Sequence, residues 1–323
     1  MATFGIEFVP NVPTKELVDY CVFAEDNGLD FLWITDHYNN RYVFEMLALI
    51  ADKTSRIKLG PGITNAFTSN PAVTASACCT VDEISNGRAT LGIGPGDLST
   101  LPKIGMAMET PVARLTEAVT VIKGLWSGAP VNTPDAKVFK FAGAQLAFKP
   151  KSKAIPVYIG AQGEKMLETA GKIGDGALIN ASNPKDFAFA VPIIKKAAAE
   201  KKFDIAAYTS FSINKDAKKA KGAVRPVVGF IAAGAPVPVL QRHGLDLNAV
   251  NTIKGGLAKG DFKTAFGAVS DAMIDAFSIY GTPEEMKAKI AGLEAAGCTQ
   301  IVAGSPIGAD KNQSIRLIGK YII

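Results

Sequence analysis

The sequence has few of the residues that bind metals or form disulfides. Its 323 residues include only two histidines, His37 and His243, and four cysteines without a CxxC pair. Zinc sites and disulfide frameworks need clusters of these residues. The sequence therefore predicts neither a metal site nor a disulfide-stabilised fold, and the neighbouring Cys78 and Cys79 suit a helix as small apolar residues.

Long apolar segments and concentrated charge are also absent. No uninterrupted apolar run reaches 18 residues, and no basic and apolar leader precedes the first strand pattern, so we expect no membrane span and a cytoplasmic location. The net charge is +5, and the lysines are scattered rather than interleaved with aromatic residues, which disfavours nucleic acid as a partner. Residues are 48% hydrophobic and 20% charged, a composition typical of soluble globular proteins.

What the sequence does contain is an alternation of strand and helix patterns. Eight apolar segments that end in polar or glycine-rich residues are predicted as strands: 4–10, 31–37, 57–64, 89–97, 156–162, 176–182, 206–214 and 298–306. Helical patterns lie between them, which indicates right-handed βαβ units and a parallel sheet. Eight such units favour an α/β fold of the (β/α)₈ TIM-barrel type over a doubly wound sheet.

We expect residues 1–323 to form a single domain with two insertions. Residues 127–153 alternate in the manner of a hairpin, and residues 216–276 are helical and irregular. Neither segment fits the regular βα rhythm, so both are expected to be additions to the barrel.

The first strand pattern, FGIEFVP, contains a carboxylate among apolar residues. An isolated buried charge is costly, so Glu7 is expected to be paired, protonated or functional. A structural ion pair with an Arg or Lys of a neighbouring strand is the alternative to a functional role.

Polar residues also follow the other strands, at the barrel end where TIM-barrel active sites lie. Asp36 and His37 end the second strand, and GAQGEK follows the fifth and opens a helix. Backbone N–H groups and the helix dipole at such a turn can hold a phosphate, although a simple βα turn has the same pattern. GIGPGD lacks the full dinucleotide-loop spacing. His37 is as well explained by bracing a loop.

The chain resembles the bacterial-luciferase-like superfamily and, within it, most closely the F420-dependent 5,10-methylenetetrahydromethanopterin reductases of methanogenic archaea. The resemblance covers nearly the whole chain. It rests on FGIEFVPN, WITDHYNNRYVFEMLALIA, GPGITNAFTSNPA, LGIGPGDLSTLPKIG, PVYIGAQGEKMLETAGKIGDG and GTPEEMKAKIAGLEAAG.

The resemblance implies a luciferase-like barrel that binds coenzyme F420, a 5-deazaflavin hydride carrier. It implies reduction of 5,10-methylenetetrahydromethanopterin, or of tetrahydrosarcinapterin in its methylene form, to the 5-methyl compound in methanogenesis. It also implies a homodimer or homotetramer.

Site residues follow from the same resemblance. It implies a non-proline cis peptide at Gly62-Ile63 that forms a bulge against the deazaflavin ring. The phosphate-binding turn matches Gly160, Ala161, Gln162 and Gly163, and contacts to the deazaflavin or pterin match Asp36, Thr64, Asn65 and Asp97. No metal is expected.

The reaction that the resemblance implies gives Glu7 a sharper role. Reduction of the methylene bridge breaks one carbon–nitrogen bond, and the departing nitrogen needs a proton. A carboxylic acid kept neutral by burial can supply it, so Glu7 is predicted to be the general acid.

Two other classes of function stay open. One is a different oxidoreductase on the same barrel, either an F420-dependent alcohol dehydrogenase or an FMN-dependent luciferase-like monooxygenase. Glu7 and the WITDHYNN run weigh against it. His37 keeps the alcohol dehydrogenase open, because in the related deazaflavin dehydrogenases a histidine beside the Asp of the second strand serves alcohol oxidation. The other class is a non-catalytic flavin-binding barrel.

Overall fold

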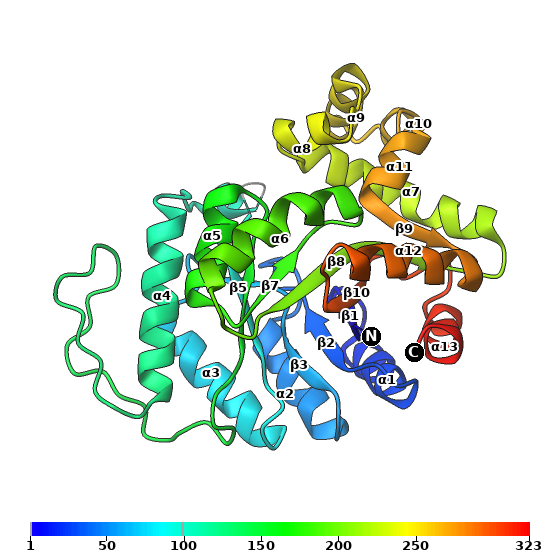
Figure 1. Cartoon of the computed structure of the whole chain (residues 1–323). Coiled ribbons are helices and arrows are strands. Elements are labelled where there is room, and N and C mark those ends of the chain that lie inside the picture. Colours follow the sequence, from blue (N-terminus) through cyan, green and yellow to red (C-terminus); the bar gives the residue numbers. More distant parts are fainter. Residues whose placement is uncertain (1, 98–99) are drawn as a thin grey trace.

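A parallel barrel forms the centre of the molecule. The computed structural model describes residues 2–97 and 100–323. Its strands follow the order β3-β2-β1-β10-β8-β7-β6-β5-β4, with β9 paired to β8 (Figure 1). Their bounds are β1 Thr3–Phe8, β2 Phe31–Ile34, β3 Lys58–Pro61, β4 Thr64–Asn65, β5 Leu91–Gly94, β6 Val157–Gly160, β7 Gly176–Ile179, β8 Asp204–Ile213, β9 Ser278–Gly281 and β10 Gln300–Gly304.

Backbone hydrogen bonds close the barrel between β3 and the start of β5. The N–H of Leu59 donates to the Arg88 carbonyl at 3.1 Å, and the N–H of Thr90 donates to the Leu59 carbonyl at 2.9 Å. Strands β3 and β4 are two parts of one barrel strand, which is interrupted at Gly62-Ile63. Counted in this way, the barrel wall has the eight strands that the sequence predicts, and we call each of these eight wall positions a stave. The TIM-barrel prediction is confirmed, and the doubly wound alternative is wrong.

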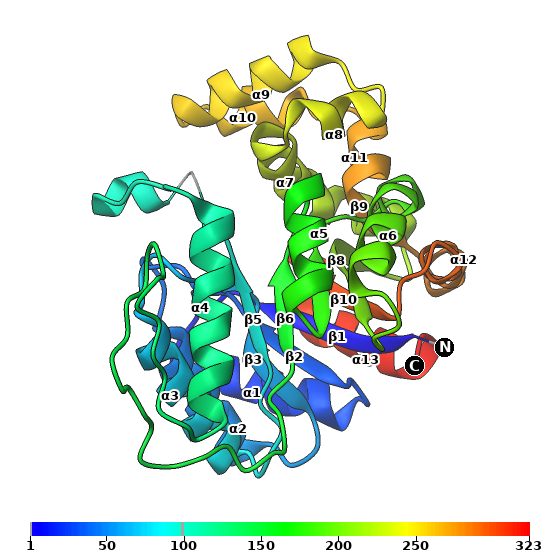
Figure 2. The same ribbon diagram turned by 60° about the vertical axis from the view of Figure 1, so that its left-hand side comes forward.

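Helices surround this barrel, and both termini lie near α1 and α13 (Figures 1 and 2). The first six are α1 Thr14–Asp26, α2 Val43–Lys53, α3 Pro71–Ile84, α4 Pro111–Trp126, α5 Glu164–Ile173 and α6 Pro184–Ala198. The last two are α12 Pro283–Ala295 and α13 Lys311–Tyr321, and a 3₁₀ turn occupies Leu101–Ile104. Local sequence fixes several helix starts. In α12, for example, Thr282 and Glu285 form a reciprocal capping box.

The segment between β8 and β9 folds as a helical lobe, which stands apart at the top of Figure 1. It consists of α7 Ala217–Gly234, α8 Val237–Arg242, α9 Leu247–Ala258, α10 Phe262–Gly267 and α11 Asp271–Phe277. These helices bury their own apolar cluster, which includes Val224, Val228 and Ile253. The lobe returns to the barrel through β9, a strand that the sequence analysis did not predict.

Residues 127–153 form a long excursion after α4 with very little strand pairing. Val131 and Ala144 form a single antiparallel bridge, exchanging hydrogen bonds of 2.8 and 3.2 Å. The hairpin-like alternation therefore predicts that the chain doubles back here, but extended strands do not form. Glu117 of α4 secures the excursion instead, accepting N–H bonds from Lys137, Val138 and Phe139.

Strand alternation divides the apolar residues into two cores. Phe4, Ile6 and Phe8 of β1 face the helices and belong to the main core. The inward register of the barrel forms a separate cluster that includes two stacked aromatic residues, Phe31 and Trp33. We call this cluster the aromatic layer; its buried members are Phe31, Trp33, Tyr158, Leu178, Ala206 and Val302.

Polar residues on the amino-terminal side of the aromatic layer are joined by hydrogen bonds. The Trp33 indole donates to Gln300 at 2.9 Å, and the Gln300 amide donates to Asp204 at 3.0 Å. The Tyr158 hydroxyl donates to the same Asp204 carboxylate at 2.8 Å. This network links four staves, β2, β6, β8 and β10, and closes the amino-terminal end of the barrel.

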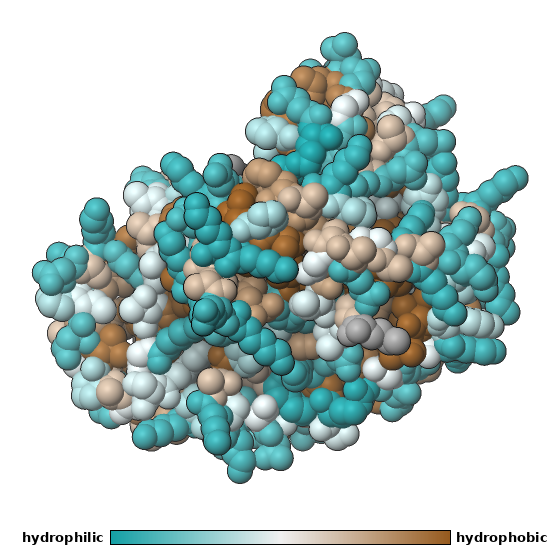
Figure 3. All heavy atoms as spheres, in the orientation of Figure 1, coloured by the Kyte–Doolittle hydropathy of each residue, from teal (hydrophilic) through white to brown (hydrophobic). Residues whose placement is uncertain are grey.

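The surface in the view of Figure 3 is mostly hydrophilic, with hydrophobic residues in separate patches. Among the residues that the structure describes, no helix has the length and apolar character to cross a membrane. The same residues contain no group of three or more His, Cys, Asp or Glu side chains able to hold a metal ion. All four cysteines are buried and unpaired.

Arg88 stabilises the backbone beside the point where β3 and β5 close the barrel. Its guanidinium donates to the carbonyls of Ala51, Thr54, Ile57 and Ser85 at 2.6 to 2.9 Å. Replacing it with leucine leaves these partly buried acceptors without a donor, and should lower the free energy of unfolding by about 2–4 kcal/mol.

Urea denaturation measures this change, and Arg56→Leu is the matched control. Arg56 also bonds two carbonyls, those of Glu25 and Leu29, but in a more exposed position. We expect its loss to cost less than about 1 kcal/mol. Equal costs for the two variants would contradict the role given to Arg88.

Candidate functional site

Glu7 lies inside the barrel, above the aromatic layer. It shares the inward register of β1 with Gly5, and only 4% of its surface is exposed. One carboxyl oxygen accepts the N–H of Ser305 at 2.7 Å. Among the described residues Glu7 forms no salt bridge, so the structural ion pair considered from the sequence is wrong.

Burial has the largest effect on the pKa of Glu7. Desolvation raises the pKa of its carboxyl above the ordinary value, outweighing the hydrogen bonds from Ser305 and the positive charge of Lys311, which lower that pKa. Tyr208, on the inward register of β8, is close enough for the Glu7 charge to raise the pKa of its phenol, after the larger effect of burial. Glu7 is therefore a buried acid suited to releasing a proton.

The predicted bulge is present at the carboxyl end of the third stave. Gly62-Ile63 is a cis peptide, as predicted. The Tyr208 hydroxyl donates to the Gly62 carbonyl at 2.9 Å. A Cβ atom at Gly94 or Gly160 would lie 2.2 or 2.3 Å from the Ile63 side chain, so both glycines leave room for it.

A cavity of about 570 Å³ opens beside this bulge; we call it the bulge cavity. Seven of the predicted site residues line it: Gly62, Ile63, Asp97, Gly160, Ala161, Gln162 and Gly163. Tyr208, Asn180, Met108 and Met166 complete much of the wall. The turn that follows β6 therefore faces the same space as the bulge, as the sequence predicts.

The turn after β6 fits a phosphate group. Gly163 precedes the first residue of α5, and no side chain caps the N–H groups of this helix end. A Cβ at Gly163 would meet nothing within 4 Å, which leaves the backbone open to a ligand. The Gln162 amide donates to the Asn180 carbonyl at 3.0 Å and braces the turn. Such a helix start binds anions through its N–H groups and dipole.

Asp36, Thr64 and Asn65 line a second cavity, of about 520 Å³, which we call the polar cavity. Thr64 donates its hydroxyl to the Asp36 carboxylate at 2.7 Å. Burial nevertheless raises the pKa of Asp36. The Asn65 side-chain oxygen accepts the N–H groups of Phe67 and Thr68 at 2.9 Å each, so this residue also shapes the loop.

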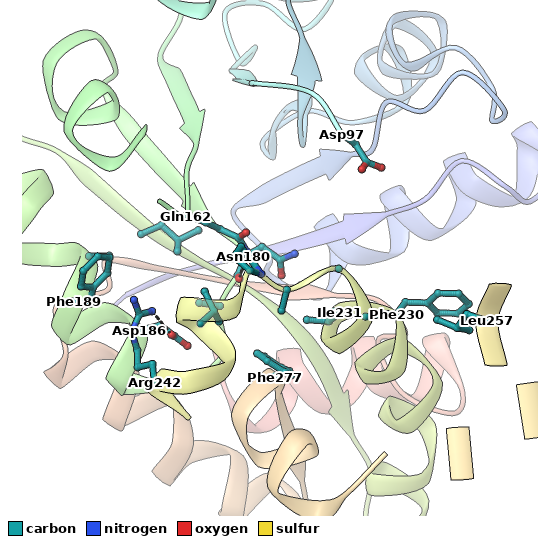
Figure 4. Close-up of a pocket in the computed structure, with 18 of the residues that line it drawn as sticks. Asp97, Gln162, Asn180, Asp186, Phe189, Phe230, Ile231, Arg242, Leu257 and Phe277 are labelled. Atoms are coloured by element: carbon teal, nitrogen blue, oxygen red, sulfur yellow. Dashed lines mark hydrogen bonds and ion pairs between the residues drawn. The ribbon is translucent and has the colours of Figure 1, made fainter. Parts of the chain in front are cut away.

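A third cavity, of about 670 Å³, lies between the barrel end and the helical lobe (Figure 4); we call it the lobe cavity. It shares Asp97, Gln162 and Asn180 with the bulge cavity, and His37 with the polar cavity. Arg242 of the lobe pairs with Asp186 of α6 at 2.7 Å. Three adjoining cavities thus follow the carboxyl end of the barrel, although Glu7 lines none of them.

Sequence reasoning missed the contributions of β8 and the lobe. Tyr208 lies in a predicted strand, but the small residues around it gave no sign of which face is inward. Gly234 and Pro236, at the end of α7 and just after it, come from a segment that had been expected only as an insertion.

Comparisons with known proteins agree with this geometry. The family model described as luciferase-like monooxygenase matches residues 4–300. A 5,10-methylenetetrahydromethanopterin reductase of Archaeoglobus fulgidus is 53% identical, over 99% of this chain and 98% of the relative.

Solved structures give the same picture. The coenzyme F420-dependent tetrahydromethanopterin reductase of Methanopyrus kandleri is 44% identical, with a TM-score of 0.95 over 99% of this chain and 98% of that chain. An F420-dependent secondary alcohol dehydrogenase solved with an F420–acetone adduct is 22% identical over 99% of this chain and 98% of that chain, with a TM-score of 0.81, and shares the fold.

The raised pKa of Glu7 predicts how stability depends on pH. The folded protein holds the Glu7 proton to a higher pH than the unfolded chain does. Between the two pKa values, the Glu7 contribution to the free energy of unfolding therefore falls as pH rises, by at most about 1.4 kcal/mol per pH unit.

Glu7→Gln should remove this decline, and urea denaturation across a pH series measures it. Glu200→Gln, which alters an exposed carboxyl, is the control and should keep the wild-type slope. An unchanged slope in Glu7→Gln would mean that Glu7 is charged in the folded protein.

Proposed function

The chain belongs to the luciferase-like family and, within it, to the family of the 5,10-methylenetetrahydromethanopterin reductases, and we propose that it reduces the methylene group of 5,10-methylenetetrahydromethanopterin to a methyl group with reduced coenzyme F420. The observation that carries this proposal is 53% identity over essentially the full lengths of both chains. The cavities and the buried acid at the barrel end agree with it.

The residues of the bulge cavity fit coenzyme F420. The Gly160–Gly163 turn and the open start of α5 would hold its phosphate, and the Gly62-Ile63 bulge would support the flat ring. Asp36, Thr64, Asn65 and Asp97 would bind polar atoms of the deazaflavin or the pterin from the adjoining walls. Reduced F420 supplies a hydride when bound.

Glu7 is the general acid in this proposal. Breaking one carbon–nitrogen bond of the methylene bridge leaves a nitrogen that takes up a proton, and the carbon then accepts the hydride. Burial favours the protonated form of Glu7, which forms no salt bridge among the described residues. Transfer of that proton to the nitrogen converts Glu7 to a carboxylate, which the N–H of Ser305 already contacts.

The two alternative oxidoreductase functions have weaker support. The alcohol dehydrogenase structure is only 22% identical in sequence to this chain, and a similarity at that level shows a common fold. His37 does line the polar and lobe cavities, where it can brace bound ligands. The burial of Glu7 and its raised pKa, by contrast, support a role in nitrogen protonation.

We also propose that the chain is one domain and acts as a homodimer or homotetramer in the cytoplasm. Hydrogen bonds between β9 and β8 tie the lobe to the barrel. An apolar cavity of about 770 Å³ between α1 and α2, lined by Val18, Phe23 and Leu49, offers surface for a second copy. Four unpaired buried cysteines suit a reducing compartment.

The proposed reaction predicts a choice of cofactor and a dependence on substrate. The purified protein should bind F420 more tightly than FMN in a fluorescence titration. It should oxidise reduced F420, followed by absorbance, only when methylenetetrahydromethanopterin is present. Equal or tighter binding of FMN would overturn the assignment, and so would oxidation that does not depend on the pterin.

The role of Glu7 predicts a large and selective kinetic loss. Glu7→Gln keeps the shape of the side chain but has no carboxylic proton, so kcat should fall by roughly 10²–10⁴-fold. F420 affinity should change little, because the cofactor-binding residues lie on other strands. A kcat within about threefold of wild type would remove Glu7 from the mechanism.

A further inference from the structure

Ser210 has a buried hydroxyl without a hydrogen-bond partner among the described residues. Its exposed fraction is 4%, and its Oγ makes no hydrogen bond to any described residue. An unpaired buried hydroxyl costs about 1–3 kcal/mol. Ser210 lies on β8, two residues beyond Tyr208 and on the same inward register.

The strand register places Ser210 opposite Glu7 across a single glycine. Ile6 pairs with Ala303, which brings Glu7 beside Gly304, and Gly304 pairs with Ser210. A Cβ at Gly304 would lie 3.2 Å from a carboxyl oxygen of Glu7, so that carboxyl extends over the glycine toward β8. Because Gly304 has no side chain, nothing from β10 separates the two.

The distance between these strands suits a contact between the two side chains. Neighbouring strands are about 4.8 Å apart, so β1 and β8 are separated by about 10 Å across β10. A glutamate side chain and a serine hydroxyl together cover most of this gap. The effect of the Glu7 charge on Tyr208 agrees that the carboxyl reaches the inward face of β8.

We propose that Ser210 is a positioning residue for Glu7, whose hydroxyl donates a hydrogen bond to the carboxylate that forms when Glu7 gives up its proton. The proposal rests on the proposed function only for the destination of that proton. The serine keeps its own proton throughout. The Glu7 proton passes to the departing nitrogen of the substrate.

Such a contact favours the charged state of Glu7 over the resting state. In the resting protein burial favours the neutral form of Glu7, and Ser210 has no partner among the described residues; after proton transfer the new carboxylate and the Ser210 hydroxyl become partners. An interaction that forms only as charge develops lowers the barrier rather than strengthening substrate binding. The other titratable groups that act on Glu7 are Tyr208 from β8 and Lys311 from α13.

Ser210→Ala tests the proposal, with Ser212→Ala as its matched control. Ser212 is on the same strand and register, has an exposed fraction of 0%, and also has an unpaired hydroxyl. It pairs with Tyr280 of β9 rather than with Gly304. It is the next inward-facing residue of β8 after Ser210 and therefore lies farther from Glu7. Both variants remove one unpaired buried hydroxyl, so both should keep or raise the melting temperature.

Infrared titration provides a readout that needs no cofactor or substrate. The carbonyl stretch of protonated Glu7 is assigned by its loss in Glu7→Gln and then followed against pH. Removing a donor to the carboxylate should move the midpoint to higher pH in Ser210→Ala and leave it unchanged in Ser212→Ala. Equal midpoints in wild type and Ser210→Ala would overturn the proposal.

Steady-state kinetics then separate this contact from the proposed reaction. With F420 and methylenetetrahydromethanopterin, Ser210→Ala should lower kcat by about tenfold with little change in KM. In the pH dependence of kcat, the decline at alkaline pH should move to higher pH. If the infrared midpoint shifts in Ser210→Ala but the wild-type protein does not turn over these substrates, the contact is supported and the proposed function is refuted. Turnover with a wild-type profile in Ser210→Ala would refute the contact alone.

Discussion

The Glu7 carboxyl lies inside the barrel, where it accepts the N–H of Ser305 and forms no salt bridge with any described residue, and the proposed chemistry depends on this environment. Desolvation dominates, so the pKa of the carboxyl rises and its protonated form is favoured. A lysine or arginine in direct contact would hold the carboxyl charged, and a charged carboxylate cannot act as an acid. The charge of Lys311 lowers the pKa without cancelling the effect of burial.

The shape of the site depends on small residues at the ends of the staves. Ile63 enters the barrel end because Gly94 and Gly160 have no side chains there, and Tyr208 secures the bulge from the opposite wall. Larger residues at either glycine would displace Ile63 and with it the wall of the bulge cavity. Gly304 acts in the same way, since its missing side chain leaves Glu7 room to reach across β10.

Most of the barrel was predictable because each stave combines an apolar run with a polar or glycine-rich end. Strand β9 was not, because Ser278–Gly281 is short and follows α11 directly, without a turn that would separate the two patterns. The cavity walls from the lobe depend on long-range packing that local sequence does not encode.

Individual side-chain environments were harder to predict than strands. The sequence showed that Glu7 is buried but left an ion pair open, because the answer depends on which residues surround it in space. Its hydrogen-bond donor, Ser305, lies 298 residues away. Tyr208 was overlooked for a related reason, since alternation identifies two faces of a strand but not which of them is inward when both carry small residues.

At the amino-terminal end of the barrel four polar side chains form one hydrogen-bonded network, although the Thr90 hydroxyl just before β5 has no partner among the described residues. Below the aromatic layer, Trp33, Gln300, Asp204 and Tyr158 satisfy one another, and the network stabilises the closed end. Of the six described side-chain atoms that are buried without a partner, three belong to the carboxyl end: the hydroxyls of Thr35, Ser210 and Ser212.

Stability alone does not explain the unpaired hydroxyls at the carboxyl end of the barrel. Each unpaired hydroxyl costs about 1–3 kcal/mol, a large fraction of the roughly 5–15 kcal/mol that stabilises a typical domain. Alanine or valine would fill the same positions without this cost. In the proposal made for Ser210, its hydroxyl gains a hydrogen bond only when charge appears on Glu7, so the cost of leaving it unpaired in the folded state becomes a preference for the charged one.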